Sequence, residues 1–182
     1  MRLLGLYMFI ILLCVSTAQA REEFWYLGAG GGSTFLQDKE DAFEEIEEKS
    51  FTAKTYLGYR ASHYLALELE YAYLGEYDLI RASVEDKAEF SALSFSIVVM
   101  YPLVFEDFEL YTPVGISAIA ADYGIDDDVI GGFKLGFGIA YTPTKHFTMR
   151  MGGEVTVFDL EVEETKFKQN LASVYATVQV NF

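Results

Sequence analysis

Two segments of this 182-residue sequence contain residue types that can bind a phosphate or a metal ion. The run from Gly28 to Gly32 is rich in glycine, but a phosphate-binding loop also needs a following helix and a lysine. Instead, seven acidic residues lie between Asp38 and Glu48, and they would repel a phosphate. The aspartates at 126–128 lack the spaced oxygen ligands and final glutamate of a calcium loop. We therefore predict no cofactor and no metal site, and interpret the glycines as inward-facing residues of a strand.

Charged residues recur at alternate positions of segments that otherwise carry glycine and small polar side chains. These residues are Lys54, Arg60, Glu68, Glu70, Lys134, Arg150 and Glu154. Four basic and three acidic groups are nearly balanced, which predicts ion pairs, because an unpaired charge in a narrow interior is costly. Turns expected at 62–63 and near 144 set which residues face each other. They predict two pairs, Lys54 with Glu70 and Lys134 with Glu154, and leave Glu68 and Arg150 as a candidate pair across the interior.

The elements that must position these charges have a period of two. Apolar and polar residues alternate in eight segments, as in strands with one apolar and one polar face. The segments are 24–35, 51–61, 65–73, 89–101, 108–121, 133–141, 147–157 and 172–182. Most are about ten residues long, enough for a tilted strand to cross a bilayer. The predicted fold is all-β, an eight-stranded antiparallel up-and-down transmembrane β-barrel.

The connections between these segments alternate in length. Three are short, at 62–63, 102–107 and 142–145, and four are long and acidic, at 36–50, 74–87, 122–130 and 161–170. Short turns at one end and long loops at the other are typical of outer-membrane barrels. An even number of strands then places both termini at the short-turn, periplasmic end. The first long connection, from Asp38 to Lys49, is also a candidate for a short helix.

The identity of each face separates a membrane barrel from a soluble one. A lipocalin-type barrel points its apolar face inward around a ligand. Here the glycines and charges lie on one face and the large apolar residues on the other, so we expect the apolar face to meet lipid. Aromatic residues gather at both ends of the strands, as in interfacial girdles. Near the short turns these are Trp25, Tyr59, Tyr64, Tyr101, Tyr141, Phe147 and Phe182; near the long loops they are Phe35, Phe51, Tyr73, Phe90, Phe133 and Phe158.

The first twenty residues have the three parts of a secretory signal peptide. Arg2 gives a positive start, the apolar run from Leu3 to Val15 follows, and small residues end at Ala20. The apolar run is too short to span a membrane as a helix. We predict a signal peptide at 1–20, cleaved near Ala20, and a barrel domain at 21–182. The single cysteine lies in the leader, so the mature chain would carry no thiol.

The composition excludes several classes of protein. With 28 acidic and 13 basic residues the formal charge is −15, which argues against nucleic-acid binding through a basic face. One cysteine excludes a disulfide scaffold and a cysteine-based zinc site. An apolar fraction of 52% argues against a disordered acidic chain. Most of the acidic residues fall in the four long connections, so we expect the negative charge at one end of the barrel.

Several stretches resemble the small outer-membrane barrels of OmpA and OmpX type. They are Phe24-Trp25-Tyr26-Leu27-Gly28-Ala29-Gly30, Leu57-Gly58-Tyr59-Arg60, the hairpin strand from Tyr64 to Tyr71, and the terminal Asn181-Phe182. The resemblance covers residues 21–182 and implies insertion in the outer membrane of a Gram-negative bacterium. It also implies that the assembly machinery of that membrane recognises the last strand, which ends at Phe182. Unlike full-length OmpA, the sequence stops at that strand, so a peptidoglycan-binding domain is not implied.

Some barrels of this size modify lipid A with a histidine and a serine or carboxylate. His63 and His146, the only histidines, are both expected at short turns, away from the outer leaflet where lipid A lies. We therefore predict a non-enzymatic protein with no catalytic residues. Its acidic extracellular loops would serve surface interaction or adhesion, with a host or matrix partner, or envelope integrity beside lipopolysaccharide. A small, low-conductance channel is the alternative.

Overall fold

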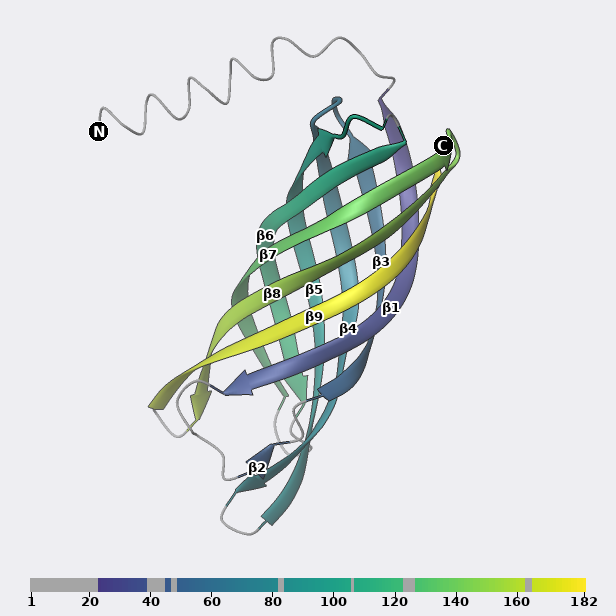
Figure 1. Ribbon diagram of the computed structural model, residues 1–182. Helices are drawn as coiled ribbons and strands as arrows, with labels where there is room; N and C mark the ends of the chain where they lie inside the picture. Colours follow the sequence, from purple (N-terminus) through teal and green to yellow (C-terminus); the bar gives the residue numbers. More distant parts are fainter. Residues whose placement is uncertain are drawn as a thin grey trace, which may run out of the picture.

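The computed structural model describes residues 23–38, 45–46, 49–81, 84–105, 107–122, 127–162 and 165–182. Eight long strands wind into a barrel, and a two-residue strand, β2, lies beside it (Figure 1). Their bounds are β1 (Phe24–Asp38), β2 (Glu45–Ile46), β3 (Lys49–Arg60), β4 (Leu65–Arg81), β5 (Val84–Pro102), β6 (Phe108–Asp122), β7 (Asp127–Thr144), β8 (Phe147–Val162) and β9 (Thr165–Asn181). The predicted signal peptide lies outside the described residues.

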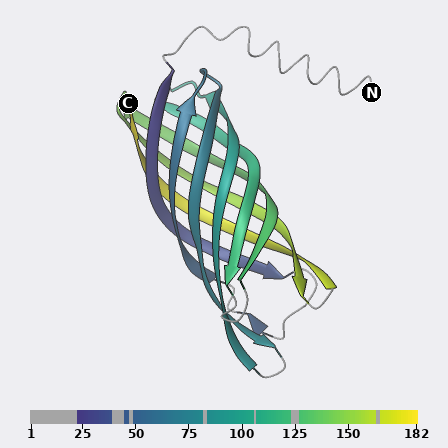
Figure 2. The same ribbon diagram turned by 180° about the vertical axis from the view of Figure 1, so that it is seen from behind.

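The barrel is closed by pairing of its first and last strands. Each long strand pairs antiparallel with the next in sequence, and β1 pairs with β9 from Tyr26–Asn181 to Asp38–Gln169. The view from behind shows the sheet continuing around the far side (Figure 2). Closure leaves no open sheet edge in the central part of the barrel, as strands in lipid require. The predicted eight-stranded antiparallel barrel is confirmed. Within the described ranges, no helix is long and apolar enough to cross a membrane.

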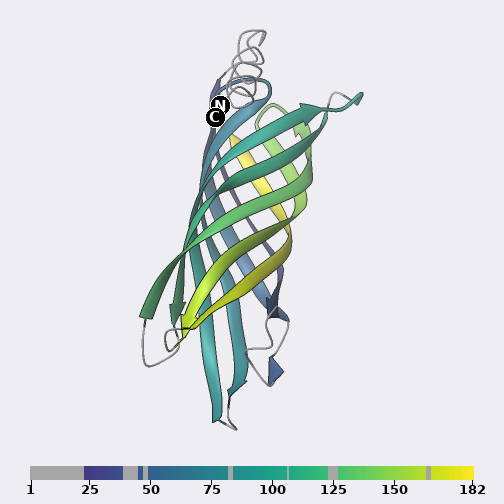
Figure 3. The ribbon, with the colours of Figure 1, turned by 90° about the vertical axis from the view of Figure 1, so that its left-hand side faces the viewer.

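The two ends of the barrel differ. At the turn end, where β3 meets β4, β5 meets β6 and β7 meets β8, the C-terminal Phe182 pairs with Trp25 of β1 through two backbone hydrogen bonds of 2.9 and 3.1 Å. At the loop end, the β4–β5 hairpin runs well beyond the other strands (Figure 3). After an irregularity between Tyr73 and Gly75, its pairing continues to Arg81 opposite Val84.

Much of the sequence expected as long loops is therefore strand. β4 and β5 cover most of 74–87, and β8 and β9 cover most of 161–170. In the sequence of these extensions the apolar–polar alternation is interrupted, as at Glu85-Asp86-Lys87. A strand beyond the bilayer needs no apolar face, so the alternation used to predict strands ends where the lipid ends. The helix expected between Asp38 and Lys49 is also wrong where the structure describes it, since Glu45 and Ile46 form β2 against Ile80 and Leu79.

The alternation sorts side chains as predicted in the central part of each strand. Leu67, Leu69 and Phe95 point outward and are exposed, whereas Glu68 and Glu70 of the same hairpin point inward and are buried. The outer face is apolar and the inner face is polar, the reverse of a soluble ligand-binding barrel.

The aromatic residues follow the same rule, with two corrections. At the turn end Trp25, Tyr64, Tyr101, Tyr141 and Phe182 are exposed on the outer surface, and Tyr59 and Phe147 are half-buried there.

At the loop end Phe51 and Phe133 are exposed, but Phe90 and Phe158 are only 3% exposed and point into the barrel. Their positions have the same parity as the inward residues Ser94 and Glu154 of their strands. Placement at a strand end therefore does not decide whether an aromatic residue faces lipid.

Candidate functional site in the barrel interior

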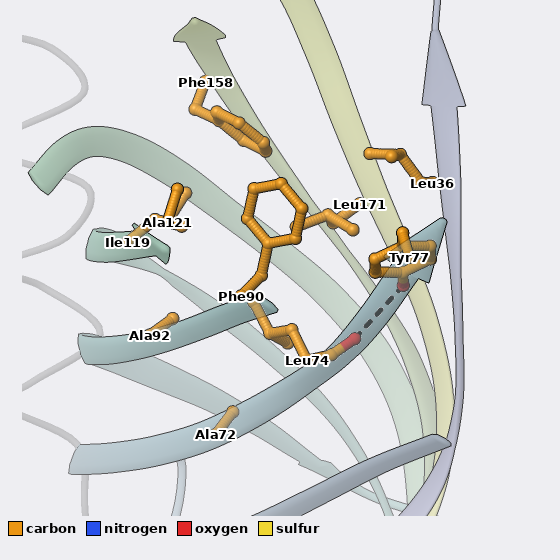
Figure 4. Packing of buried hydrophobic residues seen from close by; sticks show 10 residues of the cluster. All are labelled: Leu36, Ala72, Leu74, Tyr77, Phe90, Ala92, Ile119, Ala121, Phe158 and Leu171. Carbon is orange, nitrogen blue, oxygen red and sulfur yellow. Dashed lines mark hydrogen bonds between the residues drawn. The ribbon is translucent and has the colours of Figure 1, made fainter. Parts of the chain in front are cut away.

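The loop end of the interior is filled by apolar side chains that we call the apolar cap. It consists of Leu36, Ala72, Leu74, Tyr77, Phe90, Ala92, Ile119, Ala121, Phe158 and Leu171 (Figure 4). The rings of Tyr77 and Phe90 meet edge to face with centroids 5.8 Å apart, and those of Phe90 and Phe158 lie 6.3 Å apart. The Tyr77 hydroxyl donates to the carbonyl of Leu74 at 3.1 Å. The cap therefore fills the described part of this end of the interior mainly with apolar side chains.

A layer of hydroxyl groups lies on inward positions adjacent to the cap. Thr34 and Ser173 hydrogen-bond at 2.9 Å between β1 and β9, and Ser94 and Ser117 at 2.8 Å between β5 and β6. All four are buried. Each hydroxyl can donate to one partner and accept from another, so these short side chains satisfy each other without water.

Beside these hydroxyl groups, four charged residues form a closed ring, the charge quartet, in which Glu70 is opposite Ser94 and Glu154 is opposite Ser173. Lys54 lies 3.0 Å from Glu70 and 2.8 Å from Glu154. Lys134 lies 3.3 Å from Glu154 and also contacts Glu70. Each ammonium thus bridges both carboxylates, and all four residues are at most 6% exposed. The ring is neutral, which offsets the large cost of removing charges from water.

The pairs predicted from the turns are in contact, but the predicted register is wrong by two residues. Lys54 faces Ala72 rather than Glu70, and Lys134 faces Thr156 rather than Glu154. The first turn is wider than expected, because the amides of both Ala61 and Ser62 donate to the carbonyl of Leu65. The second has an irregularity between Tyr141 and Thr144. The long lysine side chains reach the carboxylates diagonally, so the ion pairs form without direct opposition.

Arg150 forms a second ionic centre, inside a cage of tyrosines. Its guanidinium donates to Glu68 at 2.5 Å, which also accepts a hydrogen bond from the Tyr26 hydroxyl at 2.7 Å. The rings of Tyr26, Tyr56 and Tyr111 lie 5.2, 5.1 and 5.1 Å from the guanidinium carbon. Arginine favours such aromatic faces because its planar charge is weakly hydrated. The structure thus brings Glu68 and Arg150 together across the lumen.

Glycines make room for this cage. In three directly opposed positions of neighbouring strands a tyrosine faces a glycine: Tyr26 faces Gly58, Tyr56 faces Gly28, and Tyr111 faces Gly138. A Cβ atom at each of these glycines would overlap the opposing ring. The glycine-rich start of β1 is therefore a strand whose missing side chains accommodate neighbours, and not a phosphate loop.

At the turn end the interior opens into a cavity of about 500 Å³. Its lining includes Phe24, Met100 and Arg150, and it reaches the exposed Lys145 and His146 at the mouth. We call this cavity the vestibule.

The partner of Arg60 was not predicted. Arg60, on the wall of the vestibule, donates to both carboxylate oxygens of Glu109 at 2.8 Å each. Glu109 is 4% exposed and gives the interior a fourth acidic residue. The sequence does contain a sign that Glu109 points inward: it lies two residues from the inward Tyr111 in the weakly alternating segment 108–121.

The described residues show no arrangement for metal chemistry. None of their His, Cys, Asp and Glu side chains form a group of three or more placed to hold a metal ion. His63 packs edge to face on Tyr64 with centroids 4.9 Å apart, and the ring of His146 lies 3.3 Å from the carbonyl oxygen of Asn181. Both histidines lie at the turn end, as expected. Asp126 lies outside the described residues.

Comparison with known proteins identifies the family. The family described as OmpA-like transmembrane domain matches residues 20–154. The chain belongs to this family. It is an outer-membrane β-barrel, which agrees with its closed sheet and apolar outer face. No curated protein matches the chain.

Solved structures share the fold of this OmpA-like barrel. Neisserial surface protein A is 17% identical, with a TM-score of 0.67 over 87% of this chain and 97% of that chain. Ail, the attachment invasion locus protein of Yersinia pestis, in complex with the heparin analogue sucrose octasulfate, is 10% identical, with a TM-score of 0.59 over 88% and 99%. The outer membrane protein OprG of Pseudomonas aeruginosa is 9% identical, with a TM-score of 0.53 over 88% and 95%. At these identities the likeness concerns the fold alone.

Proposed function

We propose that this protein is a non-enzymatic outer-membrane barrel that presents an acidic platform at the cell surface for a basic partner. The observation that carries the proposal is the extension of the β4–β5 hairpin beyond the barrel, with β2 paired to its outer part (Figure 3). We call these three strands the hairpin platform. Extended, paired backbone at a loop end forms a defined surface, unlike a flexible loop.

The charge of the platform supports a basic partner. From Glu76 to Glu89 the sequence has five acidic residues and two basic ones, and the connection before β3 adds seven acidic residues. A concentrated negative potential attracts cationic surfaces and speeds their encounter. Sulfated glycans would be repelled. We therefore infer that the ligand class of this chain differs from the polysulfated ligand bound to Ail.

The layered interior supports a closed barrel over the channel alternative. An ion entering from the loop end would have to pass the apolar cap and then the charge quartet, where each carboxylate is already paired. The vestibule extends only from the turn end. Interiors of barrels with this strand number are normally filled by side chains.

The proposal includes the route to the membrane. Residues 1–20 would direct export and be cleaved near Ala20. The assembly machinery of the Gram-negative outer membrane would recognise β9 and its end at Phe182. The turn end then faces the periplasm, and the hairpin platform faces outward, beside lipopolysaccharide.

A hairpin-shortened variant tests the proposal. Residues 76–88 are replaced by Asn-Gly, which suits a two-residue hairpin turn. Proteoliposomes of the variant and the parent are tested for binding to a lysine-rich peptide and to matrix-coated surfaces. We expect binding to fall at least about tenfold and the parent's binding to weaken with added salt.

The matched control places a charge change at the other end. Glu23→Gln removes an exposed acid at the turn end and should leave binding unchanged. Migration of unheated samples on SDS gels shows that each variant is folded. Equal binding by the folded, shortened variant would refute the proposal, and large steady currents in planar bilayers would favour the channel.

A further inference from the structure

The turn between β5 and β6 exposes two large apolar side chains. Val104 is 96% exposed and Phe105 is 73% exposed, the highest values among the large apolar residues of the described part of the chain. The turn end of an outer-membrane barrel is the end with short turns, where water-exposed polar residues are expected. Exposed apolar side chains that continue a larger apolar surface mark a site of contact with a partner or a membrane.

The exposure belongs to an ordered turn. The amide of Leu103 donates to the carbonyl of Phe108 at 2.9 Å, and the amide of Phe108 donates to the carbonyl of Phe105 at 2.9 Å. The ring of Phe108 stacks on Tyr141 of β7 with centroids 4.7 Å apart and planes at 23°. Hydrogen bonds and stacking fix the base of the turn, so its apex has a defined direction.

The other two turns at this end are polar and are tied to the mouth of the vestibule. Arg60 donates to the carbonyls of Ser62 and His63 at 3.2 and 2.6 Å. Asn181 donates to the carbonyl of Lys145 at 3.0 Å. These contacts hold both turns against the barrel. The β5–β6 turn is tied to β7 at its base, where the amide of Thr142 donates to the carbonyl of Asp107 at 2.8 Å, and Figure 3 shows the turn reaching outward from the barrel.

The apolar apex continues the lipid-facing surface of the barrel. Tyr101 precedes Val104 by three residues, lies on the outer face of β5 and is 65% exposed. Tyr64 is exposed beside it and accepts a backbone hydrogen bond from Met100 at 2.8 Å. Tyrosines of this kind lie at the level of the lipid headgroups. The β5–β6 turn starts at this headgroup level and reaches outward from the barrel, so its apex stays in the membrane interface.

We propose that Val104 and Phe105 insert into the boundary between headgroups and acyl chains of the leaflet at the turn end. The turn then acts as an interfacial anchor, and its ligand class is phospholipid. Aromatic and aliphatic side chains bind at this depth by burying apolar area, and binding needs no specific headgroup contact. The anchor lies at the opposite end from the hairpin platform, so the two proposals are independent.

A single-tryptophan variant measures where the apex lies. Trp25→Phe removes the only tryptophan, and Phe105→Trp places one in the turn. The protein is folded into phosphatidylcholine vesicles, with and without lipids brominated near the headgroup. We expect blue-shifted emission that brominated lipids quench strongly and aqueous acrylamide quenches weakly.

The matched control is Lys145→Trp in the same Trp25→Phe background, because Lys145 is exposed at the vestibule mouth and Asn181 holds its turn there. It should show red-shifted emission that acrylamide quenches. Emission from the Phe105→Trp variant that acrylamide quenches and brominated lipids do not would overturn the proposal. Blue-shifted emission insensitive to both quenchers would also overturn it, and would indicate a second protein copy as the cover. A spin label on Val104→Cys gives an independent measurement of depth. Its accessibility to oxygen, which partitions into lipid, is compared with its accessibility to a water-soluble relaxant.

Discussion

The loop end and the turn end of this barrel share one sheet but exclude water differently. At the loop end the inward positions hold the apolar cap, and at the turn end they surround the vestibule. The ion pairs near each end experience different surroundings as a result: the charge quartet lies on the sealed side, and Arg60 and Glu109 line the cavity. The backbone period sets only which residues point inward. The side chains at those positions decide where water can reach.

The largest expected effect comes from breaking the charge quartet. Lys134→Met leaves Glu70 and Glu154 sharing one cation in a sealed interior, so we expect a loss of about 3–5 kcal/mol in the free energy of unfolding. Arg60→Met, beside the vestibule, should lose about 1–3 kcal/mol, because cavity water can solvate Glu109. Urea unfolding in lipid vesicles, followed by Trp25 fluorescence, measures both. Equal losses would mean that the two ends do not differ in water access.

A smaller effect is expected at the glycines that accommodate the tyrosine cage. Gly58→Ala places a Cβ in the ring of Tyr26, and overpacking of this kind costs about 1–3 kcal/mol. The matched control is Gly131→Ala on the outer face, where a Cβ would meet nothing within 4 Å. The control should change stability by no more than about 0.5 kcal/mol in the same urea assay. Equal effects of the two variants would contradict the close packing of the cage.

The smallest expected effect is a difference in labelling between the two ends. In a Cys14→Ser background, Thr148→Cys lies in the vestibule and Ser94→Cys lies in the hydroxyl layer near the cap. A small polar thiol reagent should label the first at least about tenfold faster, since the second needs local opening of the barrel.

Phe90→Ala sharpens this comparison. It removes a central ring of the apolar cap and should raise labelling of the cysteine at position 94, while labelling at position 148 stays the same. If the folded protein that retains Phe90 were labelled faster at position 94 than at position 148, the loop end would be the end that is open to water. The exposed Thr144→Cys gives the rate expected for free access.

Strongly alternating strands could be predicted from the sequence, and so could their inward charges. In the central parts of β4, β7, β8 and β9 the period of two identifies the inner face, and it places Glu68, Lys134 and Arg150 in the interior. The alternation is weaker near the strand ends, so it does not identify Phe90, Phe158 and Glu109 as inward residues.

Register could not be predicted, because it depends on turn hydrogen bonds that the sequence does not display. Neither could the extensions of β4, β5, β8 and β9, where the selection for an apolar face ends with the bilayer. The vestibule also escaped prediction. The volume of a cavity depends on the conformations of long side chains such as Arg60 and Arg150. Alternation shows only that these side chains point inward, and not how much of the interior they fill.

The tyrosine–glycine oppositions have a consequence for assembly of the barrel. If β1 slipped by two residues against β3 in one direction, Tyr26 would meet Tyr56 and both rings would compete for one space. A slip in the other direction would leave Gly28 opposite Gly58, with a void between the strands. The sheet backbone alone accepts either slip, since both keep each residue on its proper face. The placement of each inward tyrosine opposite a glycine therefore disfavours both slipped registers and selects the native pairing of β1 with β3.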